Sequence, residues 1–132
     1  MEIHPSGIYD AIMYYHNKYK KPVMVAENGI ATEDLKPRKD RWTREAAIVE
    51  HVKYMQKAIA DGANVIGYYH WSITDNYEWG TFTPRFGLYN INAMTDNTLQ
   101  RIPTPAVDAY KSVIMNGGVN QEISAKYQPP SF

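Results

Sequence analysis

Cysteine is absent from the 132-residue sequence, which excludes disulfides, thiolate chemistry and a zinc ribbon. The 14 basic and 14 acidic side chains balance, so there is no broad positive field to attract nucleic acid or an anionic membrane. No apolar run reaches the about 18–20 residues that a membrane span needs. The first residues lack the basic segment and apolar core of a secretory signal. We therefore expect a soluble cytoplasmic protein that binds neither nucleic acid nor membrane.

Glycine-rich phosphate loops and metal-ligand spacings are also missing. Neither GxGxxG nor GxxxxGKS/T occurs, and no serine stands in an elbow motif that would support a nucleophilic triad. The histidines show no metal spacing; they are His4, His16, His51 and His70. His16 and His51 fall in predicted helices as surface or packing residues, whereas His70 is equally compatible with lining a pocket. No metal or cofactor is expected.

Aromatic residues are abundant. They make up 13% of the chain, and 11 of them are tyrosines. One explanation is a tyrosine-rich core and surface. The other is a sugar site, in which flat rings stack on pyranose faces and tyrosine hydroxyls bond to sugar hydroxyls.

Hydrophobic periodicity predicts three helices and two strands. The predicted helices and their apolar stripes are 8–19 (Ile8, Ile12, Tyr15, Tyr19), 43–60 (Ile48, Val52, Met55, Ile59) and 104–116 (Val107, Tyr110, Ile114). Continuous apolar runs predict buried strands at 23–26 and 65–71. The rest is predicted as a loop at 30–42, an irregular stretch at 72–100 with a short hairpin arm at 85–91, and a tail of little pattern at 119–132.

This alternation predicts an α/β fold in which parallel strands are joined by helical crossovers. Two strands alone cannot form a stable parallel sheet that is covered on both faces. We therefore expect the sheet to be incomplete, with further strands supplied from elsewhere.

Glu27 directly follows the buried run 23–26. Burying an unpaired carboxylate is costly, so such a residue usually sits at the exposed end of its strand. In parallel barrels the C-terminal strand ends carry the chemistry. Two interpretations are equally supported at this point: Glu27 is catalytic, or it caps a loop or pairs with an arginine.

A second cluster of polar and aromatic residues follows the second predicted strand. Its members are Trp71, Asp75, Asn76, Glu78 and Trp79. They fit either a solvated loop with buried tryptophan anchors, or polyol recognition in which acids and amides bond to hydroxyls while indoles stack on the ring.

The sequence resembles family 1 glycoside hydrolases. Segment 25–29 (VAENG) resembles the family's nucleophile motif after strand seven, and 67–79 (GYYHWSITDNYEW) resembles its strand-eight signature. Segments 85–89 (RFGLY) and 101–103 (RIP) are similar to the regions that follow. The matches keep the family's order and spacing from about Ile3 to Gly118, and their character is closest to archaeal β-glycosidases.

The resemblance implies a fold and a reaction. The family is a (β/α)8 TIM barrel that hydrolyses β-linked glycosides with retention. Residues 1–118 would supply helix 6, strand-helix 7 and strand-helix 8, and 119–132 would be a C-terminal tail. Relatives that act on 6-phosphosugars carry a serine- and lysine-containing phosphate site where this chain has Glu78 and Trp79, so the implied substrates are unphosphorylated β-glucosides or β-galactosides.

The resemblance also implies a role for each matched site residue. Glu27 would be the nucleophile, and Asn28 would support its loop. Trp71 would stack beneath the sugar, Glu78 and Trp79 would hold its hydroxyls, and Phe86 would help to close that wall.

The departures from the family are large. No Asn-Glu-Pro motif, which carries the family's acid/base, occurs in the chain, and a complete barrel takes about 250 residues. We therefore expect the chain to be inactive alone and to need an N-terminal barrel fragment or self-association for stability. A non-catalytic truncated remnant or sugar-binding fragment is the alternative. A cellulase-like barrel fits the strand-eight signature less well.

Overall fold

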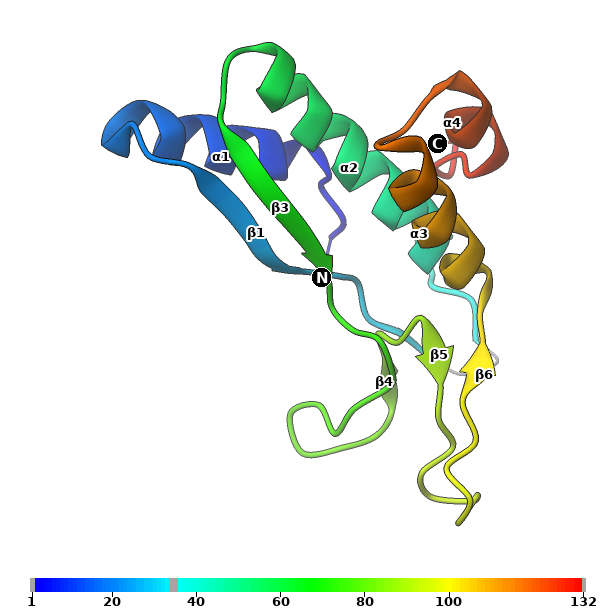
Figure 1. Ribbon diagram of the computed structural model, residues 1–132. Coiled ribbons are helices and arrows are strands. Elements are labelled where there is room, and N and C mark those ends of the chain that lie inside the picture. Colours follow the sequence, from blue (N-terminus) through cyan, green and yellow to red (C-terminus); the bar gives the residue numbers. More distant parts are fainter. Residues whose placement is uncertain (1, 34–35, 132) are drawn as a thin grey trace.

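The computed structural model describes residues 2–33 and 36–131 (Figure 1). The helices are α1 (Ser6–Tyr19), α2 (Arg44–Ala60), α3 (Pro105–Asn116) and α4 (Gln121–Lys126). The strands are β1 (Val23–Asn28), β2 (Thr32–Glu33), β3 (Val65–His70), β4 (Pro84–Arg85), β5 (Tyr89–Asn90) and β6 (Ile102–Pro103). Of the helices in the described ranges, none has the length and apolar character required to cross a membrane.

The two longest strands, β1 and β3, pair in parallel and are joined through α2. Their register matches Val25 with Tyr68 and Asn28 with His70. The predicted α/β order with parallel strands is therefore confirmed. Because the strands are parallel and in this register, their C-terminal ends lie side by side, and the chain beyond β3 leads into β4, β5 and β6 (Figure 1).

Helices cover one side of this sheet. Ile12 of α1 and Ala58 of α2 form a core with the inward residues of β1 and β3, which are Val23, Val25 and Val65. A second core joins α2 to α3 and α4 through Val49, Val52, Ala109, Val113, Ile123 and Tyr127. Burial of these side chains, worth about 1.5–3 kcal/mol for each large one, holds the helical layer together.

The other side of the sheet is open. Met24 alternates with the inward Val23 and Val25, and Tyr69 alternates with the inward Tyr68, so both point away from the helices. Met24 is 50% exposed and Tyr69 is 58% exposed. In the described part of the chain, neither β1 nor β3 has a second strand neighbour. The sheet is incomplete, as the sequence predicts.

Several predicted helix faces are wrong in detail. In α1 Ile12 is buried, but Tyr15 and Tyr19 are about half exposed, and their rings stack on each other at 6.1 Å. In α3 the fully buried residues are Ala106, Ala109 and Val113. Of the predicted stripe, Val107 and Tyr110 are partly buried and pack against a core cluster, whereas Ile114 is exposed. In α2 Ile59 is exposed as well. Small side chains let α3 approach α2 closely, so the contact falls one residue away from the bulkier stripe.

The predicted hairpin at 85–91 is also wrong. β4 pairs antiparallel with β2, with Thr32 opposite Arg85, whereas β5 pairs antiparallel with β6, with Tyr89 opposite Pro103. The two arms thus bond to different partners that are distant in sequence. Part of the predicted loop at 30–42 is therefore strand β2, and its residues 34–35 lie outside the described residues.

The patternless tail contains helix α4. The Asn120 side chain caps the helix by accepting a hydrogen bond from the Ile123 N–H at 2.9 Å. Ile123 and Tyr127 bury against α2 and α3. The Gln56 amide holds both backbone groups of Val119, accepting from N–H at 2.6 Å and donating to C=O at 3.3 Å. With only six residues, α4 is too short for a repeating hydrophobic pattern to predict it.

Gly29 has no room for a side chain, because a Cβ there would lie 2.0 Å from the Trp71 carbonyl oxygen. We expect Gly29→Ala to force the ends of β1 and β3 apart and to lower the free energy of unfolding by about 1–3 kcal/mol. Chemical denaturation at a fixed protein concentration measures this. Gly7→Ala in α1, where a Cβ meets nothing within 4 Å, is the matched control and should not destabilise. Equal effects of the two substitutions would contradict this close approach.

Candidate active site

Glu27 lies next to the end of β1 with its side chain exposed. Among residues 2–33 and 36–131, no side chain or backbone group bonds to its carboxylate. The interpretation that Glu27 pairs with an arginine of this chain therefore fails. The carboxylate stands at the C-terminal end of the parallel strands, where a ligand can reach it.

Asn28 connects the two strand ends. Its backbone carbonyl accepts a hydrogen bond from the Trp71 N–H at 2.9 Å, and its side-chain oxygen accepts from the Tyr68 hydroxyl at 2.8 Å. Burial raises the pKa of Tyr68, so the phenol stays protonated and remains a donor. These bonds fix the backbone that follows Glu27.

Trp71, Glu78, Trp79 and Phe86 come together beyond β3. The Trp71 indole N–H donates to Glu78 Oε1 at 3.0 Å. The rings of Trp79 and Phe86 meet edge to face, with centroids 5.8 Å apart. Trp71 is 37% exposed and Trp79 is 76% exposed, whereas Phe86 is buried. Two accessible indoles and one carboxylate, backed by a buried ring, form a surface that can stack on a sugar and accept its hydroxyls.

Asp75 does not belong to this surface, although the sequence pattern places it in the same cluster. It is buried, and its carboxylate accepts from the N–H groups of Gly87 at 2.9 Å and Ile91 at 3.1 Å and from Arg85 at 2.9 Å. Sequence reasoning missed this structural role. The available signal was Arg85 ten residues later, because a buried carboxylate needs a cationic partner.

His70 ties β3 to the same segment. Its Nε2–H donates to the Phe86 carbonyl at 3.1 Å, and its ring lies 6.0 Å from that of Tyr110. Burial lowers the pKa of His70, and the bond to Phe86 only partly opposes this. His70 is thus a packing residue within this chain. In the described ranges, no group of histidine, aspartate or glutamate side chains could hold a metal ion.

Buried histidines make stability depend on pH. Burial also lowers the pKa of His51 below its ordinary 6.5, against the bond to the Ala47 carbonyl and the charge of Glu50. Because the unfolded chain then binds more protons, we expect the free energy of unfolding to fall as the pH drops below about 6.5. Urea denaturation at several pH values should show a shallower dependence in His51→Gln. The exposed His4 provides the control His4→Gln, and an unchanged dependence in both would contradict the assignment.

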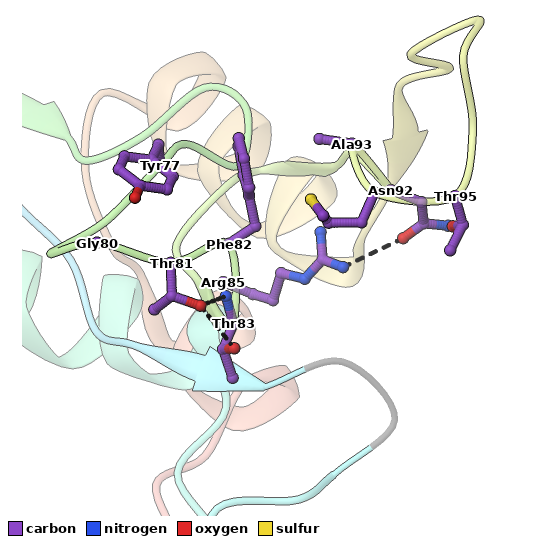
Figure 2. Close-up of a pocket in the computed structure, with 10 residues that line it drawn as sticks. Tyr77, Gly80, Thr81, Phe82, Thr83, Arg85, Asn92, Ala93 and Thr95 are labelled. Atoms are coloured by element: carbon purple, nitrogen blue, oxygen red, sulfur yellow. Dashed lines mark hydrogen bonds between the residues drawn. The ribbon is translucent and has the colours of Figure 1, made fainter.

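A hollow of about 550 Å³ is lined by residues of 77–95, among them Tyr77 and Phe82. Figure 2 shows the two aromatic side chains next to each other and Arg85 reaching across to Asn92, to which it donates at 3.2 Å. Glu27, Trp71, Glu78 and Trp79 do not line it. The predicted sugar-binding residues therefore lie outside this hollow, and Glu27, Trp71 and Trp79 are exposed.

Residues 1–119 match Glycosyl hydrolase family 1, and the chain belongs to this family. It is 42% identical over 125 residues to a β-galactosidase from Pyrococcus woesei, covering 92% of the chain and 22% of that protein. It is 34% identical to β-glucosidase A of Acetivibrio thermocellus, covering 88% of the chain and 26% of that protein.

Solved structures agree with this membership. The β-glycosidase from the hyperthermophile Thermosphaera aggregans superimposes with a TM-score of 0.82 at 30% identity, covering 98% of this chain and 25% of that one. The β-glycosidase from Pyrococcus horikoshii gives 0.81 at 37% identity, covering 98% and 29%. The chain thus spans about a quarter of the length of these four relatives, which are named as a β-galactosidase, a β-glucosidase and two β-glycosidases.

Proposed function

We propose that this chain is the nucleophile-bearing C-terminal portion of a retaining β-glycosidase barrel, made of helix 6 (α1), strand-helix 7 (β1 and α2) and strand-helix 8 (β3 and α3). The observation that carries the proposal is the position of Glu27. Its carboxylate is exposed and unpaired within the described ranges, and it lies at the C-terminal ends of the strands, next to Trp71. In a barrel that keeps this parallel strand order, both groups would lie at the C-terminal ends of the strands, where catalytic residues usually sit.

In this proposal Glu27 attacks the anomeric carbon. The bond from its carboxylate oxygen to that carbon forms while the bond to the leaving-group oxygen breaks, and an acid gives that oxygen a proton. Water then attacks the same carbon, the former acid takes the water's proton, and the ester to Glu27 breaks. The two displacements together retain the configuration.

The acid/base must come from outside these 132 residues. Retention needs a second carboxyl about 5–5.5 Å from the nucleophile, and the chain contains no Asn-Glu-Pro motif to supply it. We therefore propose that the chain alone is inactive. It would act only with the polypeptide that provides the remaining strands, and we call that assembly the completed barrel.

The other site residues would bind the sugar. Trp71 would stack beneath the ring, and its bond to Glu78 would orient that carboxylate toward two neighbouring hydroxyls. Trp79 would bond to a hydroxyl through its exposed indole, with Phe86 behind it. Asn28 would hold the loop that carries Glu27. Such a wall would suit an unphosphorylated β-glucoside or β-galactoside, because a carboxylate at Glu78 repels a phosphate.

Complementation tests this function. The chain is co-expressed with a polypeptide carrying the other strands and an Asn-Glu-Pro glutamate, and the complex is assayed on aryl β-glucosides, aryl β-galactosides and their 6-phosphates. We expect turnover of the unphosphorylated substrates only, and none by the chain alone. A correctly assembled complex that binds sugar without hydrolysing it would instead favour the sugar-binding alternative.

A further inference from the structure

We infer that Asp75 is a positioning residue for the sugar wall, by which we mean Trp71, Glu78, Trp79 and Phe86. The buried carboxylate of Asp75 fixes segment 85–91 and so holds Phe86 against Trp79. This inference rests on the proposed function for its catalytic meaning, although its geometry does not. Asp75 itself would not touch the substrate, because its side chain is 2% exposed.

Both carboxylate oxygens are used. Oδ1 accepts from the Gly87 N–H at 2.9 Å, and Oδ2 accepts from Arg85 at 2.9 Å and from the Ile91 N–H at 3.1 Å. Arg44 adds positive charge 3.9 Å from Oδ1. The Asp75 side chain therefore holds segment 85–91 at three points, which are Arg85, Gly87 and Ile91. The two arginines balance the charge of this buried carboxylate.

Phe86 lies between two of these points. Its carbonyl accepts from the Ser72 N–H at 3.3 Å and from the His70 imidazole at 3.1 Å, so its backbone is pinned against the end of β3. The neighbouring Gly87 is packed so closely that a Cβ would lie 2.4–2.7 Å from backbone atoms of Tyr89, Asp75 and Thr74. The backbone N–H of Asp75 is one of these close neighbours, so the segment is held tightly on both sides of Phe86, whose ring is buried.

The position of the Trp79 side chain depends on the Phe86 ring. Its side chain is 76% exposed, and in the described part of the chain its one ring contact is with Phe86. The backbone at Trp79 also has a left-handed φ of 48°. The order of influence is therefore Asp75, then segment 85–91 with Phe86, then Trp79 and the hydroxyl it would bind.

The experiment uses 19F NMR on the completed barrel, in which only this chain carries 5-fluorotryptophan, at its three tryptophans. Trp79 and Trp71 report the wall, and Trp42 is an internal control because it packs with Ile30, Ala46 and Ala47 in a separate core. Tryptophan-to-phenylalanine variants assign the resonances. Asp75→Asn removes the charge at constant shape, and Asp96→Asn at an exposed loop is the matched control.

We expect Asp75→Asn to shift the Trp79 resonance and to leave Trp42 in place, with no change in Asp96→Asn. In a Phe86→Leu background, Asp75→Asn should no longer move Trp79, because the coupling passes through the ring. An unmoved Trp79 in Asp75→Asn, or an equal shift in the Phe86→Leu background, would overturn the inference. If Asp75→Asn unfolds the chain, so that Trp42 moves too, Arg85→Lys is read by the same criteria.

Activity gives a second reading. In an active completed barrel, Asp75→Asn should lower kcat/KM for aryl β-glycosides by roughly 10- to 100-fold, as small misplacements of binding groups do. Asp96→Asn should leave it unchanged. An unaltered kcat/KM in Asp75→Asn would overturn the positioning role. If the complex is inactive with Asp75 intact, the proposed function fails, whereas the 19F reading still decides the geometry.

Discussion

Glu27→Gln is expected to lower hydrolysis of aryl β-glycosides by the completed barrel on the order of 10⁴-fold or more, the size of loss seen when other enzymes lose a covalent nucleophile. Glutamine keeps the shape of the side chain but cannot form the glycosyl ester. Since no described group of this chain bonds to the Glu27 carboxylate, the substitution breaks no internal contact, so the loss should be in kcat and not in assembly.

Two other glutamates serve as controls for this result. Glu33 lies on β2 with a half-exposed side chain, and Glu33→Gln should leave kcat unchanged. Glu78 bonds to Trp71 and belongs to the proposed sugar wall, so Glu78→Gln should weaken turnover by a smaller factor, through binding of the sugar. Activity in Glu27→Gln equal to that of Glu33→Gln would reject Glu27 as the nucleophile.

The isolated chain is expected to self-associate. Met24 and Tyr69 project from the open face of the sheet, and both strands leave an edge unpaired within the described ranges. Exposed apolar faces and free strand edges favour association. Sedimentation velocity should therefore show assemblies in place of a monomer, and adding the polypeptide that completes the barrel should replace them with a single complex.

Matched substitutions locate the surface responsible. Met24→Lys with Tyr69→Lys should shift the isolated chain toward monomer and should also weaken complementation. Met94→Lys with Tyr77→Lys changes the same residue types at exposed loop positions and should do neither. A monodisperse wild-type monomer with a cooperative thermal transition would contradict the expectation that the sheet needs further strands.

The sequence predicts the helices and parallel strands well because their patterns are long. The stripe of Ile48 and Val52 is buried as predicted. The run 23–26 forms the predicted strand, but only Val23 and Val25 pack against the helices, and Met24 and Ala26 are exposed instead of buried. The sequence predicts the buried faces of α1 and α3 less well, because the neighbouring element that packs against a helix decides which of its side chains are buried. Tyr15 and Tyr19 repeat at helical spacing, yet no described residue covers them deeply.

The site shows the same division. Glu27 and Trp71 lie near each other because each stands at the C-terminal end of its strand and the two strands are parallel. The sequence predicts this much, since it predicts the parallel strand order. The pairing of β2 with β4 and the burial of Asp75 join segments distant along the chain, and no local pattern encodes such contacts. Asp75 and Glu78 are both acids in one loop. Only the partners of Asp75, supplied by Arg85 and Gly87, separate the positioning residue from the proposed sugar ligand.

During turnover by the completed barrel, Glu27 should become glycosylated. An aryl β-glycoside with a very good leaving group and slow turnover of the ester, added to the completed barrel, should trap the intermediate. Peptide mass spectrometry of the quenched complex is then expected to find the sugar on the peptide that contains Glu27, with the ester on its side chain, and to find none in Glu27→Gln. A sugar adduct on any other carboxylate, or an adduct that persists in Glu27→Gln, would contradict the account.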